Sequence, residues 1–202
     1  MQLKSARQAW HDASYVSSSS TIARCAEIAR LGTDVQNTAW HNSSNRAAHI
    51  AQAGLILQAI GTLPKHLQQL GDWLYAPLTT EQANWIVEDV QESIFLSSGC
   101  NRGCEVSYWL TRAVMRDYQD LVLDRRMRLQ TPHAIRSWLA DWHGVDIDTR
   151  RWVRHWKPVW KRLWTALDDL DAQALKPVAR VIEKSKEKKI VPYRLQALMI
   201  LT

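Results

Sequence analysis

Hydrophobic positions recur at helical spacing along nearly the whole chain, and no segment alternates convincingly between apolar and polar residues as a strand does. In the N-terminal half, Gly32 and Gly61 are placed to end two helices and Pro64 to start a third. Thr79 and Gln82 have the spacing of a capping box, which opens a fourth helix. The expected spans are 21–31, 34–60, 64–75 and 80–96, with a polar run at 41–45 that allows a break in the second.

The C-terminal half begins with residues 97–104, a loop with two glycines and no apolar anchor, which is the best candidate for a domain boundary. We then expect a long helix, a second one that starts at Pro132 and stops at Gly144, and a third capped by Asp148 or Thr149. The expected spans are 106–129, 132–143 and 148–191, the last interrupted at Pro158 and Pro177, with 184–189 exposed. The final segment, 191–202, is apolar for a tail and either docks on the body or meets a partner.

Four tryptophans follow one another at a spacing of four: Trp152, Trp156, Trp160 and Trp164. Side chains four apart lie near one face of a helix, and each step overshoots a full turn by roughly 40°. Because Pro158 has no N–H to donate and crowds the preceding turn, a helix here must kink or restart. We therefore expect two pairs of rings on two helical pieces. The spacing favours rings packed in the core over rings that stack on bases of a single strand.

The segments 132–143 and 148–157, joined by a short turn with a glycine, have the pattern of a helix-turn-helix. The residues expected to bury the two helices against each other are Ile135, Leu139, Trp142, Val145, Trp152 and Trp156. The second helix would then present polar and cationic side chains outward, toward base edges and phosphates of a DNA major groove. Those side chains are Thr149, Arg150, Arg151, Arg154 and His155. The alternative is an ordinary antiparallel helix pair with a solvated basic face.

Charge is distributed unevenly along the 202 residues, whose formal net charge is +6. Residues 1–100 carry six basic and eight acidic side chains, a net of −2, and the remainder carries a net of +8. Residues 125–162 hold ten basic and three acidic side chains, which is the excess that phosphate binding requires. A solvated basic surface is the alternative explanation of the same asymmetry.

The three cysteines, Cys25, Cys100 and Cys104, are too few and odd in number for a disulfide framework, which argues for a reducing cytoplasm. The N-terminus lacks the apolar stretch of a secretion signal, and no run approaches the roughly 20 apolar residues of a membrane span. We therefore expect a cytoplasmic protein without membrane contact. Cys100 and Cys104 form at most half of a zinc site, so two free thiols are favoured over a metal.

No catalytic pattern stands out, because the sequence has no glycine-rich phosphate loop, no Gly-x-Ser-x-Gly and no His-Glu-x-x-His. We accordingly expect no enzyme activity, no cofactor and no small-molecule substrate. The carboxylates Asp168, Asp169 and Asp171 follow the tryptophans, and they have the pattern of a solvated helix face or of an intramolecular neighbour for the basic segment.

The run Trp152-Val-Arg154-His-Trp-Lys157-Pro158-Val-Trp160-Lys-Arg-Leu163 resembles the C-terminal segment of the lambda-type phage late-gene antiterminators, the Q proteins. A second, weaker similarity to this family is Gly32-Thr33-Asp34-Val35, followed by an alanine-rich helical stretch. Together the two matches cover about a tenth of the chain. The resemblance implies a helical protein that recognises DNA overlapping a late promoter, loads onto paused host RNA polymerase and promotes read-through of terminators.

On this resemblance Trp152 and Trp160 are packing positions, while Arg154 and Lys157 are the matched basic positions. The chain departs from the family at its cysteines, because the lambda protein carries two Cys-x-x-Cys pairs for zinc. Here only Cys100 and Cys104 are present, at a different spacing, so the metal is not carried over.

The combined prediction is an all-α protein of many helices with a helix-turn-helix region in its C-terminal half. Residues 1–98 would form a module for protein–protein contacts, 104–182 a basic DNA-binding region with the helix-turn-helix at about 132–157, and 183–202 a tail. The expected partners are double-stranded DNA and host RNA polymerase. The residues expected to face DNA are Arg136, Thr149, Arg150, Arg151, Arg154, Lys157 and Lys161. The alternative function is a phage or plasmid protein that binds and inhibits a host protein without touching DNA.

Overall fold

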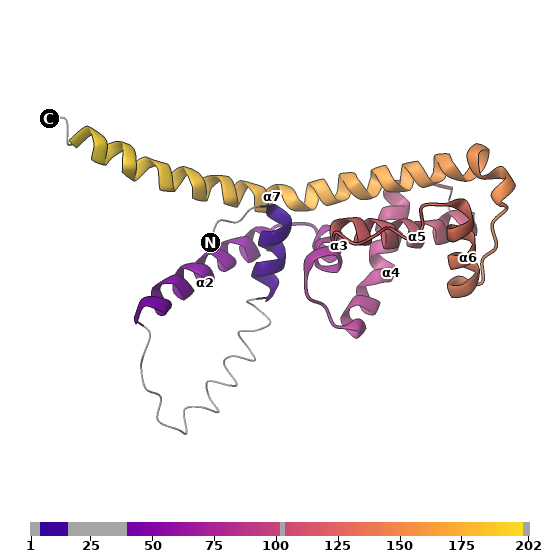
Figure 1. Ribbon diagram of the computed structural model, residues 1–202, viewed down its shortest axis with the longest axis horizontal. Coiled ribbons are helices and arrows are strands. Elements are labelled where there is room, and N and C mark those ends of the chain that lie inside the picture. Colours follow the sequence, from indigo (N-terminus) through magenta and orange to yellow (C-terminus); the bar gives the residue numbers. More distant parts are fainter. Residues whose placement is uncertain (1–4, 16–39, 102–103, 200–202) are drawn as a thin grey trace, which may run out of the picture. The chain divides into compact units, whose positions relative to one another are not determined.

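The structure is a computed structural model that describes residues 5–15, 40–101 and 104–199, with side chains described outside 40–48 and 187–199. All regular secondary structure in these ranges is helical, which confirms the all-α prediction (Figure 1). The helix expected at 21–31 and the start of the next one at Asp34 lie outside the described residues. No described helix has the length and apolar character needed to cross a membrane.

The chain divides into two compact units, one of Met1–Pro64, Tyr75–Pro77 and Ala174–Thr202, the other of Lys65–Leu74 and Leu78–Gln173. This division does not follow the boundary expected at 97–104, which lies inside the second unit. The helices on the two sides of that loop, α4 (Thr80–Ser97) and α5 (Glu105–Val122), pack against each other. The Gln91 side chain of α4 also donates a 2.9 Å hydrogen bond to the Tyr108 carbonyl of α5. The loop is therefore a connection within one core.

The second unit is built around α5, whose buried residues lie on more than one face of the helix. It also contains α3 (Lys65–Tyr75), α4, α6 (Pro132–His143) and the first part of α7 (Lys157–Met199), as Figure 1 shows. Most of its buried side chains are apolar. Full burial of a leucine typically contributes about 2 kcal/mol to the free energy of unfolding. The buried apolar side chains include Leu110, Val114, Met115, Leu139, Leu163 and Leu167.

The local boundary signals of α4 and α6 are confirmed. Thr79 and Gln82 make both hydrogen bonds of a capping box at the start of α4. Thr131 accepts from the Ala134 N–H and caps α6, which begins with Pro132 and ends before Gly144 at a φ of 66°. Glycine tolerates that left-handed conformation without steric cost, which is why the helix stops there.

The helix expected over 106–129 is shorter in the structure, because α5 ends at Val122. Asp124 adopts a φ of 54° and Arg125 donates a 2.7 Å hydrogen bond to the Asp120 carbonyl, which together form a Schellman-type stop. The Asp117 carboxylate accepts from the backbone N–H groups of Arg128 and Leu129 and holds the returning chain. Apolar spacing alone does not show these reversals.

The restart expected near Pro158 is confirmed, because α7 begins at Lys157 and Pro158 stands in its first turn. The interruption expected at Pro177 is wrong, since α7 continues through it. Pro177 removes only the hydrogen bond to the Gln173 carbonyl, and the rest of the helix retains its ladder. The side chains of the apolar tail that begins at Val191 lie outside the described residues.

The first unit contains a short helix over 6–15, α2 (Trp40–Gly61) and the later part of α7. Trp10 is fully buried, and its ring lies 6.1 Å from that of Tyr75. The helix α2 is continuous, so the break allowed at 41–45 does not occur. The apolar core of this unit includes Ala9, Ala13, Ile56, Ile60, Val178 and Ile182.

Candidate nucleic-acid interface

The helix α6 and the extended turn after it form the base of the candidate interface. Ile135, Leu139 and Ile147 are almost completely buried, and α6 packs against α5. His143, at the end of α6, stacks on Trp109 of α5 with ring centroids 4.5 Å apart, and Trp138 meets the same imidazole edge-on at 5.0 Å. This packing holds the chain that leads into residues 149–156 against the core.

The second helix of the expected helix-turn-helix is not a regular α-helix. Residues Thr149–Arg151 form a 3₁₀ turn, which Asp148 caps by accepting a 2.9 Å hydrogen bond from the Arg150 N–H. A π turn follows over Trp152–Trp156, and the Lys157 N–H donates to the Trp152 carbonyl, five residues back. A π turn within a helix often marks a functional site. The predicted capping by Asp148 is confirmed, and the regular helix over 148–157 is wrong.

The tryptophans are not arranged as two pairs. The Trp160 ring lies 6.1 Å from Trp152 and 6.5 Å from Trp164, and Trp164 in turn lies 5.4 Å from Tyr118 of α5. Three rings therefore form one connected row that fixes the π turn to α7 and to the core. Among the described residues, Trp156 makes none of these ring contacts.

Four of the six residues expected to bury the two helices against each other are not buried: Trp142, Val145, Trp152 and Trp156. The Trp142 side chain is 73 % exposed, so it does not bury α6 against the following turns. Val145 is only half-buried, and the neighbouring Ile147, which the pattern had not selected, is buried in its place. Gly144 adopts the left-handed conformation and residues 144–148 form no helix, so burial there does not follow helical spacing.

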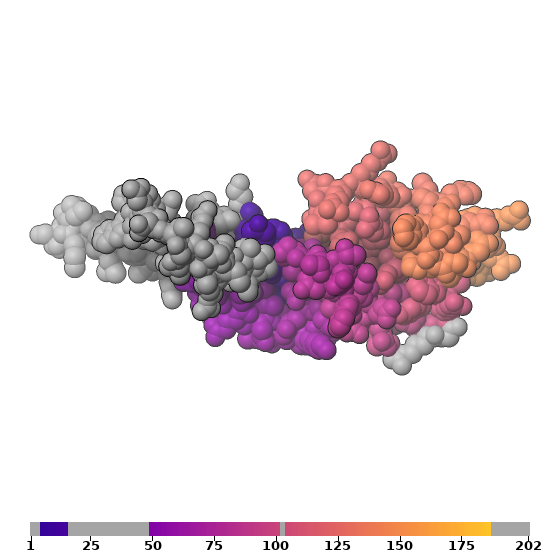
Figure 2. Space-filling view, turned by 90° about the horizontal axis from the view of Figure 1, so that it is seen from below, coloured from indigo at the N-terminus to yellow at the C-terminus, as the bar shows by residue number. Residues whose placement is uncertain are grey.

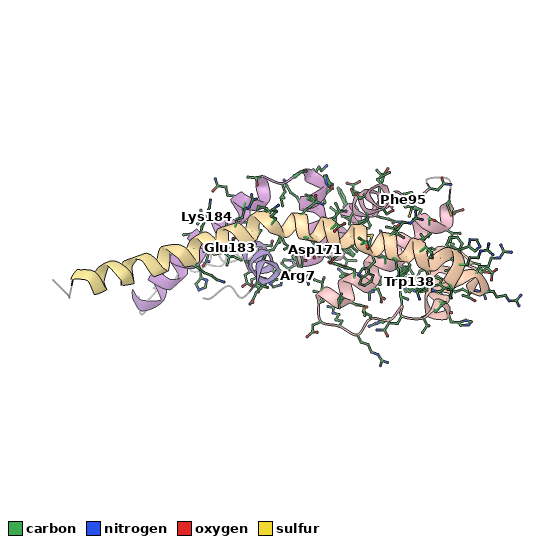
Figure 3. The ribbon with its side chains drawn as sticks, turned by 90° about the horizontal axis from the view of Figure 1, so that it is seen from above. Arg7, Phe95, Trp138, Asp171, Glu183 and Lys184 are labelled. Carbon is green, nitrogen blue, oxygen red and sulfur yellow. The ribbon has the colours of Figure 1, made fainter. Side chains whose placement is uncertain are left out.

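Four of the expected DNA-facing cations are exposed and form no ion pair with the described residues: Arg150, Arg154, Lys157 and Lys161. They come from the 3₁₀ turn, the π turn and the first turns of α7. Figure 3 shows nitrogen-tipped side chains projecting around this part of α7, and Figure 2 shows the same segment, in orange, uncovered in that view. We refer to these four residues as the cationic face.

The other three expected DNA-facing residues have different surroundings. Arg136 makes a bidentate ion pair with Asp146 at 2.6 and 3.1 Å, which raises the pKa of the Arg136 guanidinium and uses two of its five N–H donors. Arg151 lies 3.6 Å from Asp148, and both side chains are mostly exposed. Thr149 is half-buried, and its carbonyl accepts from the Trp152 N–H. Only Arg151 of these three has an accessible and weakly held charge.

A cavity of about 450 Å³ lies beside the cationic face, between the start of α5 and the start of α7. Sequence reasoning missed it, although His155, Val159 and Arg162 have the spacing of one helical face. It joins segments some fifty residues apart, which no local pattern connects. The residues that line it are Asn101, Cys104, Ser107, Asp148, Arg151, His155, Trp156, Val159 and Arg162.

The carboxylates after the tryptophans bind α7 to α5. The Tyr118 hydroxyl lies 2.9 Å from the Asp171 carboxylate and 3.1 Å from that of Asp168, and Asp171 is buried. Burial and the two carboxylates raise the pKa of Tyr118, so it stays protonated and donates. Of the three carboxylates, Asp169 is exposed and makes none of these contacts. The expectation of a solvated face is therefore wrong for Asp171.

Cys100 is buried and Cys104 is half-buried, and both are free thiols. Within residues 5–15, 40–101 and 104–199, no group of three or more histidine, cysteine or acidic side chains is close enough together to hold a metal ion. No protein-family model, curated protein or solved structure matches the chain.

Proposed function

We propose that this protein is a DNA-binding transcription regulator of the phage type, and most specifically a late-gene antiterminator that loads onto host RNA polymerase. The observation that supports DNA binding is the cationic face of Arg150, Arg154, Lys157 and Lys161. These residues are exposed and unpaired within the described part of the chain. The antiterminator form rests on the resemblance of residues 152–163 to the Q proteins.

The rigid support of this face favours a specific contact over a diffuse basic surface. Trp152, Trp160 and Trp164 hold the backbone beneath the cations, so less side-chain and backbone freedom is lost when phosphates are bound. A protein that neutralises phosphates releases condensed counterions, and each contact contributes about −0.9 to the slope of log K against log salt. The cationic face alone therefore accounts for a slope of about −3.6.

Replacing Arg150 and Arg154 by alanine tests the face directly. Because neither side chain is in an ion pair with a described residue, their loss should not disturb the fold. Duplex affinity should fall, and the salt slope should become shallower by about 2, as measured by fluorescence anisotropy over a series of salt concentrations. The matched control is Lys176→Ala with Arg180→Ala, which removes two exposed charges elsewhere on α7. Equal duplex affinities and salt slopes for the two double variants would refute DNA binding by the cationic face.

A second candidate function, binding to a host protein without DNA contact, is favoured by the surface of α4. Trp85 is 84 % exposed there, and Glu81 and Glu88 lie one turn before and after it. An exposed tryptophan with acidic neighbours fits an apolar pocket with a basic rim on a protein partner.

Binding measurements with purified RNA polymerase and with duplex DNA distinguish the two functions. For the antiterminator, Trp85→Ser should weaken polymerase binding and leave duplex affinity unchanged, because Trp85 is remote in sequence from the cationic face and already exposed. A protein that shows no salt-dependent duplex binding would leave only the second function. Polymerase binding that is the same for Trp85→Ser and for Asn84→Ser, an exposed position beside it on α4, would exclude this surface.

A further inference from the structure

The cavity beside the cationic face combines cationic, polar and apolar walls. From α7 and the turns before it come Arg151, His155 and Arg162, which carry nitrogen donors. From the start of α5 come Cys104 and Ser107. At about 450 Å³ the cavity falls within the range of small-molecule sites, which is roughly 300–1,000 Å³.

The charge in this cavity is suited to an anion. Arg162 is exposed and forms no ion pair with a described residue. Among the described residues that line the cavity, Asp148 is the only acidic one. Asp148 holds Arg151 at 3.6 Å, a distance at which two mostly exposed side chains exchange partners at little cost. An entering phosphate can therefore meet two guanidinium groups, which bind it with charge-assisted hydrogen bonds.

The first turn of α5 adds neutral hydrogen-bond donors to the lining of the cavity. Cys104 precedes the helix and makes no side-chain capping hydrogen bond. The 18-residue helix also carries a partial positive charge at this end. Ser107 contributes a hydroxyl, while the exposed Glu105 of the same turn is not among the lining residues.

The lining also includes an apolar and an aromatic side chain. Trp156 and Val159 lie on neighbouring turns, and Trp156 is the tryptophan that the row of packed rings leaves out. A half-buried indole beside cations offers a surface on which a planar base can stack, an interaction worth about 1–3 kcal/mol per base.

We propose that this cavity binds a nucleoside phosphate, with the phosphate between Arg151, Arg162 and the start of α5, and the base against Trp156. The nucleotide is either free in solution or the terminal unit of a single strand, since both present the same chemistry. The site is separate from duplex binding by the cationic face, with which it shares no residue.

Binding of each of the four ribonucleoside 5′-monophosphates to the full chain should be measured by calorimetry. Inorganic phosphate and the nucleosides test the phosphate part and the base part of the site separately. At least one monophosphate should bind more tightly than phosphate or its nucleoside. Arg162→Ala should weaken it by about tenfold or more, the usual effect of losing a charge-assisted hydrogen bond. Arg180→Ala, which removes the same charge from the same helix, should leave it unchanged. Absence of binding at millimolar concentrations, or equal effects of the two variants, would overturn the proposal.

A second measurement localises the ligand without a variant. Bound nucleotide should slow alkylation of Cys104, followed by mass spectrometry of its peptide, because that thiol lines the cavity. Alkylation of Cys104 at the same rate with and without saturating nucleotide would contradict the site.

Two further experiments identify the source of the nucleotide and distinguish this site from the cationic face. If a 5′-phosphorylated single strand competes with the monophosphate at equal affinity, the ligand is the end of a strand. If the strand binds much more weakly than the monophosphate, the ligand is a free nucleotide. The double variant Arg150→Ala with Arg154→Ala should keep its nucleotide affinity, whether or not duplex binding is lost. Nucleotide binding that falls in this variant as far as in Arg162→Ala would show general charge attraction and would refute a separate pocket.

Discussion

At the scale of single residues, the surroundings of a side chain decide which of the basic and aromatic residues are free to act. Arg136 and Arg154 look alike in the sequence, yet Arg136 is held by Asp146 while Arg154 is unpaired within the described chain. Composition identifies the basic segment, and its role in binding DNA stays a prediction. Composition could not assign the partner of each guanidinium, because Asp146 lies ten residues from Arg136 across a turn.

His143 illustrates how burial changes chemistry at this scale. Its Nε2 atom is buried with no hydrogen-bond partner among the described residues, and its ring packs against Trp109 and Trp138. Burial first, and then the nearby positive charge of Arg112, lower the pKa of His143 from its ordinary value. The folded protein therefore keeps this imidazole neutral at a pH where the unfolded chain would protonate it.

This histidine should make stability depend on pH. Since the unfolded state binds more protons as pH falls through about 6.5, the free energy of unfolding should decrease between pH 7 and pH 5. His143→Phe keeps a flat ring against the tryptophans and should remove part of that decrease. Urea denaturation at several pH values measures it, with His133→Phe at an exposed position of the same helix as control. An identical pH dependence for wild type and His143→Phe would show that the histidine titrates normally.

At the scale of elements, boundaries set by local chemistry were predictable and those set by longer contacts were not. The capping box of α4, Pro132 and Gly144 act within a few residues, and the structure confirms all three. The early end of α5 depends on Asp117 binding the N–H groups of the returning chain. The π turn depends on tryptophans packed against α5 and α7. The spacing of hydrophobic residues along the sequence reveals neither of these contacts.

The stop of α5 can be tested at Asp124, which has a φ of 54°. Aspartate adopts the left-handed conformation more readily than alanine, and glycine adopts it without steric cost. Asp124→Gly should therefore exceed Asp124→Ala in unfolding free energy by roughly 1 kcal/mol, measured by urea denaturation. In a regular helix the order would be reversed, since alanine is the better helix former there. That reversed order would mean that α5 continues beyond Val122.

At the scale of the whole molecule, the second unit brings together segments that the expected domains had separated. The loop expected as a boundary and the start of α7 line one cavity, although Cys104 and His155 lie fifty-one residues apart. A sequence without strands or a metal pattern predicts helices and their charges, but not which helix ends meet. All four residues of the cationic face were among the seven that the sequence predicted to face DNA, whereas the cavity beside them emerged only from the fold.

The proposed binding of duplex DNA by the cationic face depends on contacts between these four residues and DNA phosphates. The most direct measurement is the slope of log affinity for duplex DNA against log salt, for the wild-type chain and for a variant with Arg150, Arg154, Lys157 and Lys161 all replaced by alanine. If each residue meets one phosphate, the two slopes should differ by about 3.6. Slopes that coincide, or a wild-type protein that binds no duplex at low salt, would contradict the account.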